Sequence, residues 1–142
     1  MGYCAYADLK KLIPEESLVQ LTDDEGVGKV NQARIDEAIA QADTEIDAYL
    51  GTRYSVPFAT VPTIVGKLSV DMTIYHLYSR RVEEIPKTRA DRYKDCLRLL
   101  EGIAAGKISI GEAAEPEASA SADQAQYSSE DRIFTRDKLK GF

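Results

Sequence analysis

Residues 62–83, PTIVGKLSVDMTIYHLYSRRVE, predict one long helix that is apolar on nearly every side. Pro62 suits its first position, because proline there sacrifices no helical hydrogen bond. Two apolar stripes follow the helical period: Ile64, Val65, Leu68, Met72 and Tyr75 in one, and Val70, Ile74, Leu77 and Tyr78 in the other. A helix of this kind is buried on several sides. We therefore expect the rest of the chain to pack around it.

Asp71 interrupts this apolar segment. A carboxylate that is buried needs a partner of opposite charge or several hydrogen bonds. Arg53, in the pair Arg53-Tyr54 that follows the preceding helix, is the candidate partner in a structural ion pair. The alternative is that Asp71 points to water or to a neighbouring subunit, and the sequence leaves both interpretations open.

Four further helices are predicted on the two sides of this segment. They are two short helices, from Ala7 or Asp8 to Ile13 and over 14–21, and two long helices, from the N-cap Asn31 to Gly51 and over 87–105. Pro57 excludes a helix from the connection over 52–61. Ile108 and Ile110 either form a brief strand or pack back on the body. The sequence thus predicts an all-α fold, a compact bundle of about three long and two short helices, with an extended C-terminal arm.

The chain divides into three parts by composition. Residues 1–110 form the helical body, 111–131 an acidic low-complexity linker, and 132–142 a basic and aromatic end. Residues 108–131 contain six acidic and no basic side chains, a net charge of −6. This composition lacks the large apolar groups that a core requires, so the linker is not expected to fold alone.

The last eleven residues, RIFTRDKLKGF, combine a net charge of +3 with large apolar side chains. Such an end does not bury itself cheaply in its own domain, and it is typical of a peptide that binds a groove on another protein. We call residues 132–142 the docking segment. Its predicted partner-binding residues are Arg132, Ile133, Phe134, Thr135, Arg136, Leu139 and Phe142.

The overall composition excludes several classes of protein. The net charge of −6 and the pI of about 4.9 argue against general nucleic-acid binding, which requires a basic surface. Cys4 and Cys96 lie far apart and are expected as reduced thiols in a cytoplasmic product. No apolar run approaches the roughly 18 residues of a membrane span, so no membrane is predicted as a partner.

No catalytic, metal or cofactor site is predicted. The loop 23–28 resembles a calcium loop superficially, but each register with a glycine at position 6 places Val27, Arg34 or Leu21 where an oxygen ligand is required. His76 is the only histidine, and a packed structural role is favoured over catalysis because no nucleophile accompanies it in the sequence. The two cysteines have no metal-ligand spacing.

Most carboxylates are expected to be solvated. Asp36, Glu37, Asp43 and Asp47 fall on the polar face of the helix that follows Asn31.

A basic corner is predicted at the turn between the last two long helices. It consists of Arg80, Arg81, Lys87, Arg89, Arg92 and Lys94. Ordinary helix-end charge explains it. A contact to a neighbouring subunit through Arg80 and Arg81 is the functional alternative.

The order and spacing of several short motifs resemble the small head–tail connector proteins of Mu-like bacteriophages. The motifs are Tyr6-Ala7-Asp8-Leu9, the loop Leu21-Thr22-Asp23 to Gly28, Ala42-Asp43 to Leu50, Arg53 to Pro57, Val61-Pro62, Tyr75 to Tyr78, Arg92-Tyr93 to Leu97, Leu100-Glu101, Ala105 to Ile108, Phe134 to Asp137, Leu139 and Gly141-Phe142. The resemblance covers nearly the whole chain, with residues 112–131 free to vary. The acidity of the linker and the ligand-poor loop at 23–28 depart from the family's pattern.

The resemblance implies a structural virion protein that is not an enzyme. Such adaptors form a ring under the portal, expected to be a dodecamer, which continues the DNA channel and joins capsid to tail. The implied partners are the portal protein, a tail terminator or stopper protein of the neck, other copies of this chain, and genomic DNA in transit without sequence recognition. The docking segment would reach the portal. The alternative function is a small helical regulatory protein that recognises its target through the same segment, without a ring.

Overall fold

The computed structural model describes residues 2–81 and 84–111. Its elements are α1 (Tyr6–Leu12), α2 (Glu15–Thr22), α3 (Gln32–Leu50), α4 (Thr63–Arg81) and α5 (Lys87–Ala104). In these residues the fold is compact and all-helical, with three long and two short helices, which confirms the predicted class. The predicted C-terminal arm falls on residues outside the described part.

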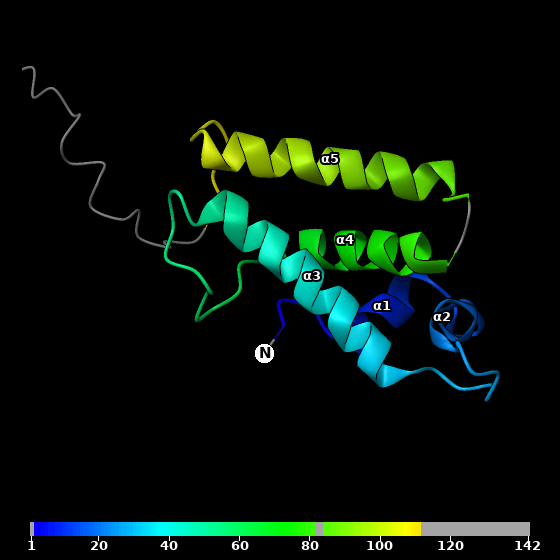
Figure 1. Ribbon diagram of the computed structural model, residues 1–142. Helices are drawn as coiled ribbons and strands as arrows, with labels where there is room; N and C mark the ends of the chain where they lie inside the picture. Colours follow the sequence, from blue (N-terminus) through cyan, green and yellow to red (C-terminus); the bar gives the residue numbers. More distant parts are fainter. Residues whose placement is uncertain (1, 82–83, 112–142) are drawn as a thin grey trace, which may run out of the picture.

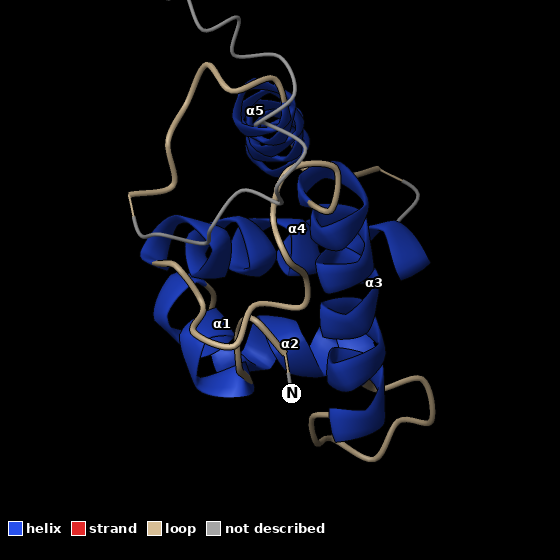
Figure 2. Cartoon of the chain, turned by 90° about the vertical axis from the view of Figure 1, so that its left-hand side faces the viewer, coloured by secondary structure: helices blue, strands red, loops and turns tan. Residues whose placement is uncertain are grey.

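Helix α4 lies at the centre of the bundle and packs against each of the other four helices. Figures 1 and 2 show α5 on one side of α4 and the short helices α1 and α2 on the other, while α3 crosses α4 at an angle. The central position predicted for residues 62–83 is therefore confirmed.

The two apolar stripes of α4 enter two different cores. Val65, Leu68 and Met72 pack with the C-terminal half of α3, with α5 and with the loop residues Tyr54 and Phe58. The other stripe packs with α1, α2 and the N-terminal half of α3. Its members Val70, Ile74 and Leu77 are buried. One helix thus joins two hydrophobic clusters into a single body.

The start of α3 and the end of α5 lie at the capping and glycine residues that the sequence predicted. The Asn31 side chain caps α3 by accepting a hydrogen bond from the amide of Ala33 at 3.1 Å. Gly106, just after α5, has φ +78, which L-residues with a side chain rarely adopt. Beyond it, Ile110 is buried against the first core, so residues 107–110 pack back on the body, one of the two predicted alternatives.

We predict that Leu77→Ala lowers the free energy of unfolding by about 2–5 kcal/mol, because it leaves a cavity in the second core. The Leu77 side chain is fully buried. Urea denaturation monitored by circular dichroism measures the effect. The matched control is Leu12→Ala on α1, where the leucine is 45% exposed and the expected change is below about 0.5 kcal/mol. An equal loss of unfolding free energy in the two variants would contradict the place of Leu77 in the core.

Candidate functional site

The N-terminal segment before α1 is held against α3 by carboxylates. The amide of Tyr3 donates to Oδ2 of Asp43 at 2.8 Å, and the Tyr3 hydroxyl donates to Oδ1 of Asp47. The same hydroxyl accepts a hydrogen bond from the amide of Phe58 at 3.2 Å. Tyr3 therefore links the N-terminus, α3 and the loop before α4.

Polar side chains continue this network between the two cores. Oγ of Ser69 donates to Oδ1 of Asp43 at 2.7 Å and lies 3.2 Å from Sγ of Cys4. The Cys4 sulfur is also 3.7 Å from Oγ1 of Thr73. Burial raises the pKa of the Cys4 thiol and of the Asp43 carboxyl. A thiol held in its protonated form is a poor nucleophile, and the contacts of Cys4 with Ser69 and Thr73 join the N-terminal segment to α4.

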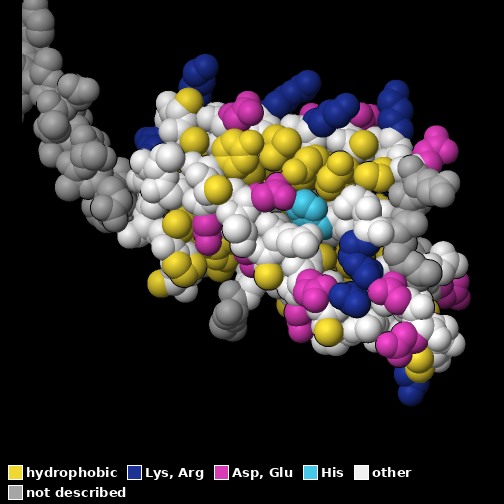
Figure 3. Space-filling model, viewed as in Figure 1, with side chains coloured by type: hydrophobic (Ala, Val, Ile, Leu, Met, Phe, Trp, Pro, Cys, Tyr) yellow, Lys and Arg dark blue, Asp and Glu magenta, His cyan; other side chains and the backbone are white. Residues whose placement is uncertain are grey.

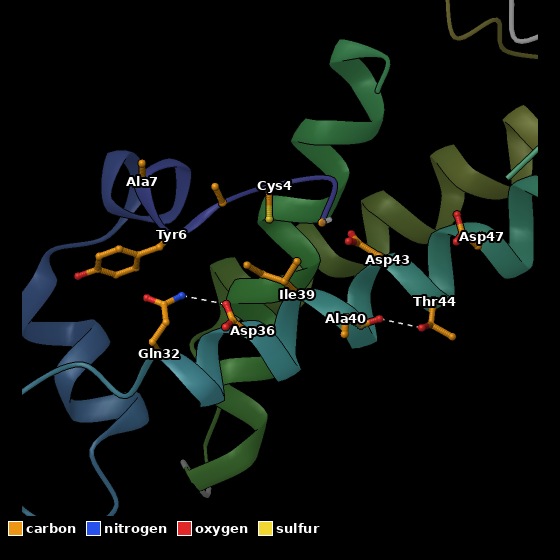
Figure 4. A pocket seen from close by; sticks show the side chains of 12 residues that line it. Cys4, Tyr6, Ala7, Gln32, Asp36, Ile39, Ala40, Asp43, Thr44 and Asp47 are labelled. Carbon is orange, nitrogen blue, oxygen red and sulfur yellow. Dashed lines mark hydrogen bonds between the residues drawn. The ribbon is translucent and has the colours of Figure 1, made fainter. Parts of the chain in front are cut away.

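A groove opens beside this network, between the N-terminal segment, α1 and one face of α3 (Figure 4). Its volume is about 770 Å³. We call it the acidic groove, and it is lined by Gly2, Cys4, Ala5, Tyr6, Ala7, Gln32, Asp36, Ile39, Ala40, Asp43, Thr44 and Asp47. Sequence reasoning placed Asp43 and Asp47 on a solvated face. This holds only in part, because Asp43 and Asp47 are half-buried and both carboxylates bind the N-terminal segment. The exposed Asp36 does lie at the surface.

His76 is packed in an aromatic and polar cluster on the face formed by α3, α4 and α5. Its Nε2 lies 2.8 Å from Oε1 of Glu45, without the alignment of a hydrogen bond. The other carboxylate oxygen of Glu45 accepts from the Tyr93 hydroxyl at 2.8 Å, and the Tyr93 ring stacks on Tyr75 at 3.9 Å. The His76 side chain is 13% exposed. These contacts pack the imidazole of His76 against Glu45, Tyr75 and Tyr93.

Figure 3 shows His76 as the single cyan patch, below a band of hydrophobic side chains along α5. Tyr49, Tyr93 and Leu97 are partly buried hydrophobic residues packed against the first core. A row of Lys and Arg side chains follows the edge beyond this band (Figure 3).

The structure does not bring Arg53 and Asp71 together. Nη1 of Arg53 donates to the carbonyl of Ile103 at 3.2 Å, near the C-terminus of α5, where the helix dipole attracts a cation. Asp71, whose side chain is 10% exposed, lies 3.7 Å from Nη1 of Arg92 instead. The predicted ion pair is therefore wrong, although each residue has an intramolecular partner. Helix α5 provides both partners, and the sequence alone did not show where α5 packs.

Arg80 makes contacts within its own chain. Its guanidinium donates to the carbonyl of Leu21 at 2.9 Å and to Oδ2 of Asp24 at 2.7 Å. These bonds fasten the loop after α2 to α4. The proposed subunit contact of Arg80 stays a prediction, and the side chain of Arg81 lies outside the described residues.

The loop at 23–28 is closed by its own aspartate. The Asp23 carboxylate accepts from the amides of Gly28 at 2.6 Å and Val27 at 3.0 Å, and these bonds lower the pKa of Asp23. Across residues 2–81 and 84–111, no group of three His, Cys, Asp or Glu side chains is placed to hold a metal ion. In the same part of the chain, no helix combines the length and hydropathy that crossing a membrane requires.

The predicted partner-binding residues Arg132, Ile133, Phe134, Thr135, Arg136, Leu139 and Phe142 all lie outside the described residues. The described body instead presents the acidic groove, which sequence reasoning missed. One signal in the sequence was available: Gln32, Asp36, Ala40, Asp43 and Asp47 recur every three or four residues and mark one continuous helix face.

The geometry defines a small helical protein whose polar contacts are structural. The chain matches the family model described as Bacteriophage Mu, Gp36 over residues 3–129. It is 34% identical over 113 residues to the Mu-like prophage FluMu protein gp36 of Haemophilus influenzae, covering 80% of this chain and 78% of that protein. It is 32% identical over 120 residues to gene product J of Escherichia phage Mu, covering 81% of this chain and 79% of that protein.

This chain is thus a protein of a Mu-like phage, and it belongs to the Bacteriophage Mu Gp36 family. The matched range includes every described residue except Gly2 and ends before the docking segment.

We predict that Tyr3→Phe lowers the free energy of unfolding by about 1–3 kcal/mol, because the amide of Phe58 and the carboxylate of Asp47 each lose a hydrogen-bond partner. Urea denaturation measures the change. The control is Tyr6→Phe, whose hydroxyl donates only a long, exposed hydrogen bond of 3.3 Å to Glu15. A Tyr3→Phe variant as stable as this control would contradict the role given to Tyr3.

Cys96 gives a pH-dependent prediction. Burial raises the pKa of its thiol to about 12, above the unfolded value of about 8.5. The stability from this group is therefore complete below the unfolded pKa and is lost as the pH rises above it. Between pH 8 and pH 10 we expect a loss of about 1–2 kcal/mol from Cys96.

The test compares urea denaturation of the parent chain and Cys96→Ala at these two pH values. The substitution also leaves a small cavity, which lowers the free energy of unfolding at both pH values. The comparison therefore uses the change in the free energy of unfolding between pH 8 and pH 10, not its absolute value. A parent and a variant with the same slope would rule out the buried, protonated thiol.

Proposed function

We infer that this chain is the head–tail adaptor of a Mu-like phage. In this role it forms a ring under the portal, continues the DNA channel and joins the capsid to the tail. The observation that carries the proposal is a closed helical body from the Gp36 family, followed by an acidic linker and a basic, aromatic docking segment.

The chain combines a packed helical body with a segment suited to binding, and this combination supports a role in assembly rather than catalysis. In the described body the buried polar side chains Ser69 and Thr73 make internal contacts, and the groups near His76 pack α3, α4 and α5 together. The docking segment offers Phe134, Leu139 and Phe142 as anchors. Large aromatic anchors that fill pockets contribute most of the binding free energy in many interfaces. The proposed partner for these anchors is the portal protein, with the segment either filling pockets or adding a strand to a portal edge.

The charge of the chain is consistent with a channel wall. A net charge of −6 repels the phosphates of a passing duplex and disfavours tight binding. A ring of identical subunits also needs a head-to-tail contact between two different faces of the body. The partly buried side chains Tyr49, Tyr93 and Leu97 offer apolar area for one such face. The further partners proposed are a stopper or tail terminator protein.

The double variant Phe134→Ala and Phe142→Ala tests the proposal in the phage that encodes the chain. We expect full heads that fail to join tails, counted by electron microscopy, because loss of each anchor costs about 2 kcal/mol or more at the interface. Tyr127→Ala in the linker is the control and should yield normal particles.

A normal yield of joined particles from the double variant would contradict portal docking. If the chain were also absent from those particles and monomeric at high concentration, the regulatory, partner-binding function would replace the adaptor.

A further inference from the structure

The acidic groove has the properties of a peptide-binding surface. Three carboxylates, Asp36, Asp43 and Asp47, line it, and no Lys or Arg is among its lining residues. The exposed Ala40 and the small exposed part of Ile39, which is 7% exposed, give it a narrow apolar floor (Figure 4). The face of α3 between Gln32 and Asp47 extends over about 22 Å at 1.5 Å per residue. An extended peptide of about seven residues has the same length.

The docking segment is complementary to this groove. It carries a net charge of +3, and Phe134, Leu139 and Phe142 match the apolar floor. Complementary charge directs a segment to the right surface and orients it, while the apolar anchors hold it there.

A second groove on the body has the wrong charge for this segment. It has a volume of about 390 Å³ and is lined by residues that include Lys11, Lys67 and Arg92. Its two carboxylates, Asp8 and Asp71, are already paired with Lys11 and Arg92. A segment of charge +3 is therefore repelled from this groove and attracted to the acidic groove.

The described part of the chain ends in the core that Tyr3 also enters. Ile110, next to the last described residue, packs in the same core as Tyr3 and Ile46. Tyr3 in turn binds Asp43 and Asp47, which line the groove. Twenty residues, 112–131, then separate the body from the docking segment. An unstructured chain of twenty residues has a root-mean-square span of about 25 Å, comparable to the length of the groove face of α3.

We propose that in the free protein the docking segment of the same chain occupies the acidic groove. A short flexible tether gives an effective concentration on the order of 1 mM. A groove with a Kd of about 0.1 mM would then hold the segment in roughly nine chains out of ten. In assembly, the partner that takes the segment has to displace it from the groove.

The acidic linker does not replace the groove as the binding partner. Its six carboxylates attract the basic side chains, but its composition of mostly Ala, Ser and Glu has no apolar surface for two phenylalanines and a leucine. The acidic groove offers more apolar lining than the linker, because Tyr6, Ala7 and Ala40 line it beside the edge of Ile39.

The test uses the full chain with Phe142→Trp. The chain contains no other tryptophan, so the indole reports on the docking segment alone. We expect a blue-shifted emission maximum and several-fold weaker acrylamide quenching than in urea, both independent of chain concentration. In the Asp36→Lys background the indole should become exposed, because a lysine in the groove repels the segment.

The matched control is Glu37→Lys, the same charge change on the neighbouring exposed residue, which does not line the groove. It should leave the indole protected. An exposed indole in the parent background, or equal effects of the two lysine variants, would overturn the proposal. Protection that grows with chain concentration would also overturn it, and would assign the groove to the segment of a second copy. None of these outcomes bears on the adaptor proposal, which is tested in particles.

Discussion

The need to cover α4 on all sides is the constraint on which the rest of the structure depends. Its two apolar stripes are too far apart around the helix to share one core, so the chain builds two. The C-terminal half of α3, α5 and the loop with Tyr54 and Phe58 cover one stripe, and α1, α2 and the start of α3 cover the other. This explains why two short helices, which would not be stable alone, precede the long ones.

The polar residues of α4 lie where the two cores meet. Ser69 and Thr73 are fully buried and contact Cys4, while Ser69 also binds Asp43. The N-terminal segment covers the polar residues between the two cores. Its hydrogen bonds to α3 place it as one wall of the acidic groove. The contacts that cover the core between α3 and α4 thus also shape the acidic groove.

The sequence predicts the fold well because the spacing of apolar residues and the capping residues at helix ends are local properties. The stripes of α4, the cap Asn31 and the stops near Gly51 and Gly106 all depend on near neighbours. The pairing of Arg53 with Asp71 failed because it depends on how α5 packs, which periodicity does not specify. The solvated positions predicted for Asp43 and Asp47 hold only in part for the same reason: a polar helix face is solvated unless another segment covers it, and the covering segment, around Tyr3, is forty residues away.

The chain joins a helical body of the Gp36 family to a basic, aromatic segment for which we propose a binding role. Quantitative mass spectrometry of purified particles tests the adaptor assignment most directly. We expect this chain at the copy number of the portal, about twelve for the expected ring. Complete, infectious particles that lack the chain would contradict it.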